Sequence, residues 1–146
     1  MKSKARENLK VVKTLYKCAA THELNAFGEK LDRNVEWIEP TVEGLWFSGM
    51  HRGAEAVLKE VMEPAEEKVE RFHPRMKKFF AVGDNVIAIG SIRGRGTMTQ
   101  EPLAAETAHV WTLRDGKVIR FEAFHDPAQW QNVLGLAGPE PQAMAA

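Results

Sequence analysis

The chain has 146 residues, the usual size of one domain with a single core. Hydrophobic residues make up 44% of it and charged residues 27%, a globular composition that excludes a disordered chain. The 20 Lys and Arg residues balance the 20 Asp and Glu residues, so no net charge draws the protein to nucleic acid or anionic lipid, and we expect neither as a partner.

Two further features of the sequence indicate the cellular compartment of the protein. Cys18 is the single cysteine, which excludes an intrachain disulfide and suits a reducing cytosol. Lys10, Lys13 and Lys17 interrupt the apolar residues of the N-terminal segment, so the hydrophobic region of a signal peptide is missing. No apolar run approaches the roughly 18 residues that cross a bilayer. We therefore expect a cytoplasmic protein without a membrane span.

The first third of the chain predicts two helices and a strand. Apolar residues recur at spacings of three and four from about Ala5 to Ala20 and again from Leu24 to Leu31. Asp32-Arg33-Asn34 predicts a turn, because short polar side chains favour turns. A strand with alternating faces should then run from Asn34 to Glu39, and Pro40 should end it because proline cannot donate to a sheet.

A third helix and four strands are expected next. Residues 44–53 predict a loop, and the apolar stripe from Ala54 to Ala65 predicts a helix that ends near Phe72-His73-Pro74, with Pro64 as a kink or break. The period then changes to two, and turn signals predict strands at about Met76 to Val82, Val86 to Met98, Ala104 to Arg114 and Lys117 to His125. Helices followed by hairpin-linked strands indicate an α+β fold with a helix-covered antiparallel sheet.

The C-terminal segment completes the domain. Asp126 and Pro127 have the residue types of an N-cap and first helical position, so a short helix should follow. We expect one domain over residues 1–137 and a flexible tail over residues 138–146, which offer little apolar surface to a core. The five histidines contain no pair at the spacing of a zinc site, so no metal is expected.

Three stretches of sequence resemble a known family. They are Trp37-Ile38-Glu39-Pro40, Gly53-Ala54-Glu55-Ala56-Val57, and the segment from Ala108 through Asp115-Gly116-Lys117 to Phe121 that closes on Asp126. With the order of elements, they resemble the SnoaL-like and ketosteroid isomerase-related proteins of the nuclear transport factor 2-like superfamily, over about Glu7 to Leu136. The resemblance implies a cone-shaped, curved sheet covered by three N-terminal helices, an apolar pocket and a dimer.

Glu39 is the principal candidate for catalysis. If Trp37 faces the core, the period of two puts Glu39 on the same inner face, where an unpaired carboxylate is costly. Glu39-Pro40 is similar in position to the Asp-Pro of ketosteroid isomerases, in which the carboxylate moves a proton between carbons. The resemblance implies that Glu39 is a general base, with a pKa raised by apolar walls.

The resemblance implies two groups that would steady a substrate oxygen. One is Tyr16, if a one-residue difference from the isomerases lies in the Thr21-His22 loop; if it lies inside the helix, Leu15 takes that place. The other is His109, with Trp111 beside it on the same face, where the isomerases carry a protonated acid. Either side chain could instead be a buried group that satisfies its own hydrogen bonds.

The last strand supplies the remaining candidates. The same alignment turns Phe121, Ala123 and His125 inward, where they would contact a ligand with Trp37 and Trp111. Asp126 lies where related cyclases often carry an aspartate, but the following Pro127 favours capping of the terminal helix as its role. Ala123 occupies the strand position at which limonene epoxide hydrolase-like sites carry an acid, so that chemistry is not expected.

Three functions fit these residues. The first is a cofactor-free isomerase or lyase that acts on a small carbonyl compound, with Glu39 as base and Tyr16 or His109 at the enolate oxygen. The second is a binding protein that holds a small apolar ligand in the same pocket without turnover. The third is a dimeric adaptor whose outer sheet face recognises protein through Ile87, Ile89 and Val110. Those residues suit a homodimer equally well, and a homodimer is expected.

Overall fold

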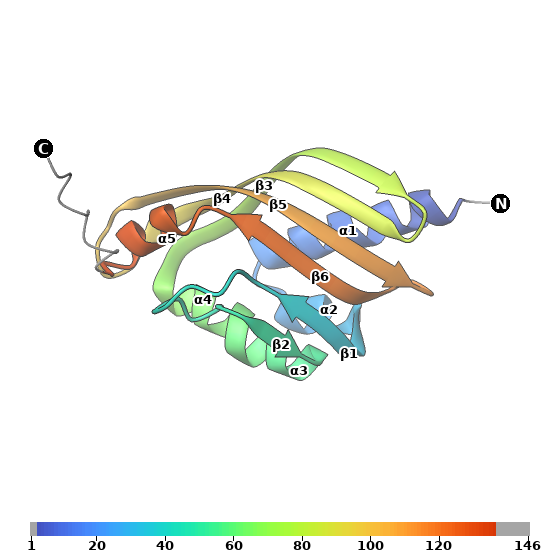
Figure 1. The fold of residues 1–146 in the computed structure, drawn as a ribbon, viewed down its shortest axis with the longest axis horizontal. Helices are drawn as coiled ribbons and strands as arrows, with labels where there is room; N and C mark the ends of the chain where they lie inside the picture. The colour runs from blue at the N-terminus through green and yellow to red at the C-terminus, as the bar shows by residue number, and fades with distance from the viewer. Residues whose placement is uncertain (1–2, 137–146) are drawn as a thin grey trace, which may run out of the picture.

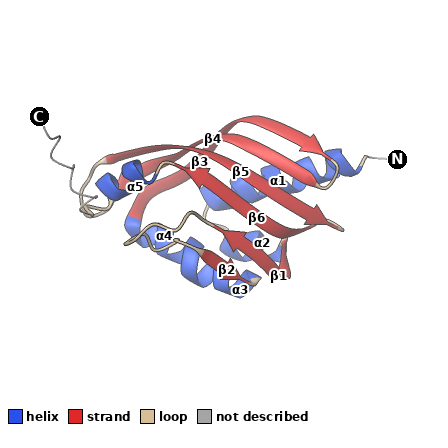
Figure 2. Cartoon of the chain, in the orientation of Figure 1, coloured by secondary structure: helices blue, strands red, loops and turns tan. Residues whose placement is uncertain are grey.

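The computed structural model of the protein describes residues 3–136, so the expected tail at 138–146 lies outside the described residues. The helices are α1 (Lys4–Ala20), α2 (Leu24–Glu29), α3 (Ala54–Ala56), a π-helix (Val57–Met62), α4 (Glu63–Lys68) and α5 (Pro127–Val133). The strands are β1 (Leu31–Ile38), β2 (Met50–Arg52), β3 (Val69–Val82), β4 (Asn85–Gly96), β5 (Pro102–Arg114) and β6 (Lys117–His125). The expected α+β class is confirmed (Figures 1 and 2).

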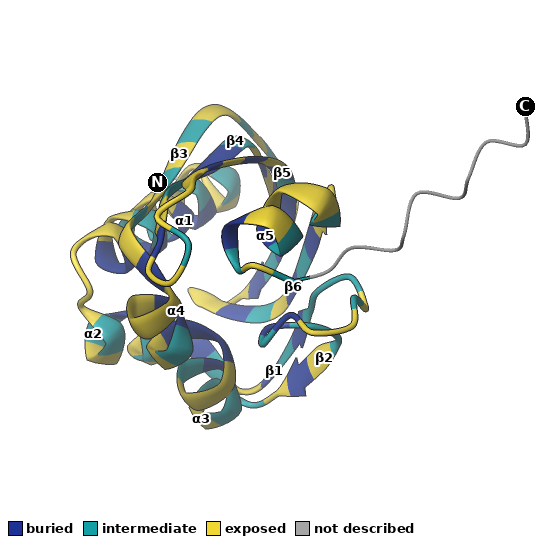
Figure 3. Ribbon diagram, turned by 90° about the vertical axis from the view of Figure 1, so that its left-hand side faces the viewer, coloured by how far each residue is buried: buried dark blue, intermediate teal, exposed yellow. Residues whose placement is uncertain are grey.

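The six strands form one curved sheet in the order β2-β1-β6-β5-β4-β3. The hairpin-linked strands are antiparallel as predicted, and so are β1 and β2, whereas β1 and β6 are parallel. Figure 3 looks along the inside of the curve, with α1, α2 and α4 facing β5, β6 and β1, and with α5 near one end. The helices thus cover the inner face of the sheet.

Helix α1 follows the periodicity of its sequence. Ser3 caps its start by accepting a hydrogen bond from the backbone N–H of Arg6 at 3.2 Å. Val12, Leu15 and Cys18 recur along the buried face of the helix. The C-terminal helix is capped in the predicted way, since Oδ1 of Asp126 accepts from the N–H of Ala128 at 2.9 Å.

Two predicted boundaries around β1 were wrong. The strand begins at Leu31, because the expected turn at Asp32-Arg33-Asn34 is instead an irregular part of the ladder with β6, where the Asn34 N–H donates to Asp32. The expected loop at residues 44–53 contains β2, which pairs with the end of β1. Three residues are too short a strand for alternation to reveal.

The third helix also differs from its prediction. It ends at Lys68, and β3 begins at Val69 rather than near Met76. Pro74 is tolerated inside β3 because this strand lies at the edge of the sheet. Pro64 does not break the helix. The π-helix ends at Met62, and the chain continues through Pro64 as α4. No helix among residues 3–136 has the length and apolar character of a membrane span.

Candidate functional site

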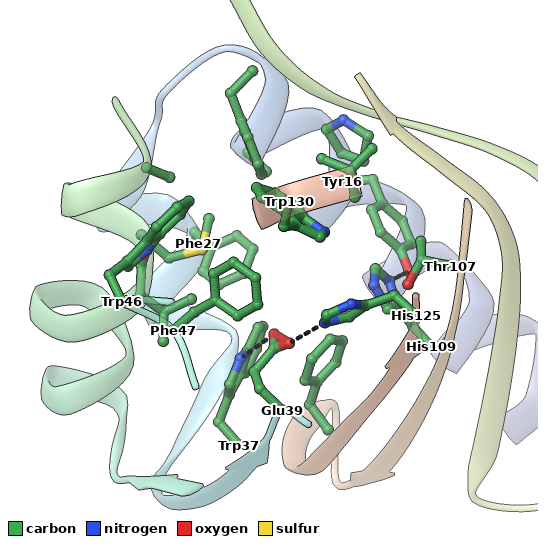
Figure 4. A pocket seen from close by; sticks show the side chains of 18 of the residues that line it. Tyr16, Phe27, Trp37, Glu39, Trp46, Phe47, Thr107, His109, His125 and Trp130 are labelled. Carbon is green, nitrogen blue, oxygen red and sulfur yellow. Dashed lines mark hydrogen bonds and ion pairs between the residues drawn. The ribbon is translucent and has the colours of Figure 1, made fainter. Parts of the chain in front are cut away.

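A pocket of about 80 Å³ lies between the helices and the inner face of the sheet (Figure 4). Its wall is mainly apolar and aromatic, with contributions from Phe27 of α2, Val61 and Met62 of the π-helix, Ile92 of β4, and Trp46 and Phe47 of the loop between β1 and β2. Polar groups reach it from Tyr16, Glu39, Thr107, His109 and His125. A concave, mostly apolar pocket with a few convergent polar groups is the usual form of a small-molecule site.

The aromatic wall is closely packed. The ring of Trp37 stacks on Phe121 with 3.8 Å between centroids, and Trp111 meets the same phenylalanine at 4.6 Å. On the other side of the pocket, Phe47 packs against Trp130 at 4.8 Å. These contacts fix the shape of the pocket, because aromatic rings have few rotatable bonds and strong edge and stacking preferences.

Glu39 lies at the end of β1 and points into the pocket (Figure 4). Its backbone N–H donates to the carbonyl of Gly49, while its Oε1 accepts from Nε1 of Trp37 at 3.2 Å. Its Oε2 lies 3.7 Å from Nε2 of His125, and only 9% of the side chain is exposed. Burial raises the pKa of the Glu39 carboxyl, against a smaller lowering by nearby His125 and by the bond from Trp37.

His125 is the one residue with buried side-chain nitrogen or oxygen atoms that lack a hydrogen-bond partner within residues 3–136. Both of its ring nitrogens are in this state, and only 4% of its side chain is exposed. The ring packs against Phe47 at 5.6 Å between centroids. An unpaired buried polar group costs about 1–3 kcal/mol, and such groups are concentrated at functional sites.

Tyr16, His109 and Trp111 form a hydrogen-bonded cluster on another wall. The Tyr16 hydroxyl lies 2.6 Å from Nδ1 of His109 and accepts from Nε1 of Trp111 at 2.9 Å. Since the indole can only donate, the hydroxyl hydrogen is free to be donated to Nδ1, which leaves the hydrogen of a neutral imidazole on Nε2. Burial lowers the pKa of His109 to about 3, helped by the nearby His125, so the ring is neutral. Burial also raises the pKa of the Tyr16 hydroxyl, which stays protonated.

Glu39 and His109 lie in one row across the sheet. His109 pairs with Ala123 of β6, and Glu39 follows Ile38, which pairs with the preceding residue, Glu122. The backbones of Glu39 and His109 are therefore about two strand spacings, or about 10 Å, apart, with the small side chain of Ala123 between them. A compact ligand in the pocket could contact both, since Glu39 and His109 line it.

The predicted site residues fall into two groups. Seven of the nine line the pocket: Tyr16, Trp37, Glu39, His109, Trp111, Phe121 and His125. Tyr16, rather than Leu15, faces it, and Leu15 is fully buried in the core. The other two predicted residues lie outside the pocket wall: Ala123 is buried beside it, and the Asp126 side chain caps α5.

Sequence reasoning missed the part of the wall that comes from the loop before β2 and from α5. Trp46, Phe47 and Trp130 lie there. Trp46 and Phe47 are adjacent aromatic residues in a segment otherwise typical of a loop. Because exposed loops seldom carry such a pair, it could have indicated that this segment packs against the core. Among residues 3–136, no group of three or more His, Cys, Asp or Glu side chains is arranged to hold a metal ion.

Comparisons with known proteins agree with this architecture. A nuclear transport factor 2-like protein of unknown function from Burkholderia pseudomallei superposes with a TM-score of 0.80 at 18% identity, over 88% of this chain and 97% of its own. TerC, co-crystallised with polyporic acid, gives 0.79 at 20% identity, over 88% and 98%. A protein of ketosteroid isomerase-like fold from Catenulispora acidiphila, in complex with trimethylamine, gives 0.75 at 15% identity, over 87% and 93%.

These structures show a shared fold, since their sequences differ widely from this one. No curated protein matches the chain significantly. The family model of the SnoaL-like domain matches residues 12–121, which include most of the pocket wall. The chain therefore belongs to the SnoaL-like domain family, with the nuclear transport factor 2-like fold.

Proposed function

We propose that the protein is a cofactor-free isomerase or lyase that transfers a proton on a small carbonyl compound bound in this pocket, with Glu39 as the general base. The observation that carries the proposal is the buried Glu39 carboxyl, whose pKa is raised within an aromatic pocket. A base works best when its pKa lies near the working pH, and burial of a carboxyl moves it in that direction.

His109 is the proposed partner of the substrate oxygen. Its Nε2–H makes no hydrogen bond within residues 3–136, and its neutral ring can donate this hydrogen to the oxygen of an enolate. Tyr16 would act through His109, because its own hydrogen is donated to Nδ1. The role of Tyr16 is then to fix the tautomer and the orientation of the imidazole.

His125 would bind a second polar group of the ligand. Its unpaired ring nitrogens provide one donor and one acceptor in the neutral ring, and Nε2 lies close enough to Glu39 to exchange a proton with it through a small rearrangement. Ligand binding would satisfy the nitrogens that the protein leaves unpaired.

The ligand should be small. A pocket volume of about 80 Å³ favours a compact ligand. TerC with polyporic acid and the Catenulispora acidiphila protein with trimethylamine are precedents for organic molecules on this fold. A small monocyclic or open-chain ketone is the substrate class that we propose.

The test is deuterium exchange at carbons next to the carbonyl of candidate ketones, with wild-type protein and Glu39→Gln. The glutamine can still accept from Trp37 but cannot take up a proton, so it should bind ligand and lose exchange by at least about a hundredfold. Glu122→Gln is the matched control, since Glu122 lies on the opposite face of β6 and pairs with Arg120. Equal exchange in Glu39→Gln and wild type would contradict the role of Glu39.

We also propose a homodimer that forms through the outer face of the sheet, in the cytoplasm. Phe80, Ile87 and Val110 pair in one row across β3, β4 and β5, and Ile89, Ala108 and Phe124 pair in a second row across β4, β5 and β6. Phe80, Ile87, Ile89 and Phe124 are exposed large hydrophobic residues. A contiguous apolar patch of this kind is typical of an interaction surface.

A further inference from the structure

His51, a residue outside the proposed reaction, occupies an unusual position beside the pocket. It lies in β2 opposite Trp37 and is 6% exposed. Its Nδ1 is 2.9 Å from Oε1 of Glu60, and its Nε2 is 2.8 Å from the carbonyl oxygen of Phe47. Both ring nitrogens therefore have close partners, in contrast to those of His125.

The two partners determine how many hydrogens the ring carries. A carboxylate oxygen and a backbone carbonyl oxygen can only accept hydrogen bonds. A neutral imidazole has a single N–H, so it can satisfy one of these contacts and would place a lone pair against the other acceptor. Both contacts, at 2.8 and 2.9 Å, are satisfied when each nitrogen carries an N–H, as in the imidazolium cation.

These contacts join two parts of the pocket wall. Phe47 belongs to the loop between β1 and β2, and its ring packs against Trp130 and His125. Glu60 belongs to the π-helix, whose next residue, Val61, lines the pocket. We call the segment from Glu39 to Gly49 the roof loop. The second attachment of the roof loop to the π-helix is the bond from Nε1 of Trp46 to the carbonyl of Val61 at 2.9 Å.

We infer that His51 is a positioning residue whose imidazolium form clamps the roof loop to the π-helix and holds Phe47 over the ligand pocket. If either nitrogen lacked its hydrogen, one of the two contacts would be lost. The roof loop would then be attached to the π-helix only through the bond from Trp46, and it would open more often. The clamp itself follows from the contacts of His51, whereas its importance for proton transfer rests on the proposed function.

The charges around His51 are consistent with a cation. Glu60 faces it from the π-helix, and Glu39 faces it from the end of β1, where the charge of His51 helps to lower the pKa of the Glu39 carboxyl against the larger effect of burial. Lys59 of the π-helix pairs with Glu55 on the exposed surface. Two further charged residues, Glu36 and Arg52, alternate with Trp37 and His51 and so lie on the other face of the sheet.

The protonation state can be measured directly. Long-range ¹H–¹⁵N correlation spectra distinguish an imidazolium from each neutral tautomer, and the signals of His51 can be assigned by their loss in His51→Gln. We expect the imidazolium pattern for His51 under the conditions of the exchange assay. A neutral pattern under these conditions would overturn the inference.

Opening of the roof loop can be followed by acrylamide quenching of tryptophan fluorescence, because Trp46 belongs to the loop and Trp130 packs against it. Glu60→Gln removes the charge that holds the imidazolium, so quenching should rise about twofold. Glu66→Gln is the matched control, because Glu66 pairs with the half-exposed His22 away from the roof loop. Far-ultraviolet circular dichroism verifies that both variants are folded.

The outcomes separate the clamp from the proposed reaction. Unchanged quenching in folded Glu60→Gln, or equal changes in Glu66→Gln, would overturn the clamp. A clamp that responds as expected beside a Glu39→Gln variant with full exchange would leave the clamp intact and refute the proposed base. Loss of exchange in Glu39→Gln beside unchanged quenching in Glu60→Gln would do the reverse.

Discussion

The hydroxyl of Tyr16 in α1 lies 2.6 Å from Nδ1 of His109 in β5, and this bond joins the first helix of the chain to the centre of the sheet. The same oxygen also accepts from Trp111. A helix that covers a sheet is usually held by apolar contacts alone, so a buried polar link of this kind fixes both the position of α1 and the orientation of the imidazole.

Tyr16→Phe should therefore destabilise the fold. The substitution keeps the ring but leaves Nε1 of Trp111 and Nδ1 of His109 buried without a partner, at a cost of about 1–3 kcal/mol in unfolding free energy. Urea denaturation measures this. Thr14→Val is the control, because Thr14 in the same helix donates to Lys10 at the exposed surface and its loss should cost less than about 0.5 kcal/mol. Equal costs would show that the buried bonds are unimportant.

The low pKa of His109 predicts a loss of stability in acid. Between its ordinary pKa of 6.5 and about 3, the unfolded chain binds a proton that the folded ring excludes. Stability should thus fall as the pH decreases through this window, by up to about 1.4 kcal/mol for each pH unit from this group. His109→Gln should show a flatter profile in denaturant titrations, whereas His73→Gln, at an exposed histidine, should keep the wild-type slope.

Burial raises the pKa of the Glu39 carboxyl, whereas it lowers the pKa of His109. The folded protein keeps the carboxyl protonated at pH values at which the unfolded chain has released the proton, so this contribution to stability is lost as the pH rises through the folded-state pKa. Glu39→Gln should then gain stability relative to wild type at the alkaline end of thermal melts between about pH 5 and about pH 9. A constant difference across this range would mean that Glu39 ionises normally.

Gly90 should tolerate no side chain. It pairs with Met76 in β3, and a Cβ atom there would lie 2.2 Å from the carbonyl oxygen of Arg75 and 2.6 Å from Cα of Met76. Since backbone atoms must move to relieve these contacts, Gly90→Ala should cost about 3 kcal/mol or more. Gly83→Ala is the comparison, because its turn offers open space and only its φ of +58° is unfavourable, for about 1 kcal/mol. Chemical denaturation of both variants gives the ranking.

Ile87→Lys should separate the proposed dimer. Ile87 lies in the middle of a pairing row with Phe80 and Val110, so a charge there would be buried without a partner in a two-fold interface. Sedimentation velocity at micromolar concentration should show a dimer for wild type and a monomer for the variant. Met98→Lys, at a residue that is 90% exposed in the β4–β5 connection, should remain dimeric. A monomeric wild type would refute the interface.

Patterns among neighbouring residues predicted the helices and turns that those residues determine by themselves. The spacing of Val12, Leu15 and Cys18 in α1 is an example, as is Asp115-Gly116, whose φ values of 51° and 77° are those of a tight hairpin turn between β5 and β6. Alternation with Trp37 also placed Glu39 on the inner face. In each case the preference arises within a few neighbouring residues.

The remaining features depend on contacts between distant segments. Leu31 continues the helical spacing of α2 but becomes the first residue of β1, because Val118 of β6 pairs with it. The three residues of β2 form a strand only because β1 lies beside them. The role of His51 was missed for the same reason, since no local pattern indicates that its two acceptors come from a loop and from the π-helix.

The parallel pairing of β1 with β6 has a consequence for the order in which the chain folds. Trp37 stacks on Phe121, 84 residues later, and no hairpin can bring the two together. Contacts between such distant residues incur a large loss of chain entropy and form late. The hairpins of β3 to β6 can assemble first, but Glu39 meets His125 only when β1 docks on the completed meander. During synthesis, the pocket therefore cannot form until β6, the last strand, has left the ribosome. Until then the side chains of Val35 and Trp37 remain uncovered.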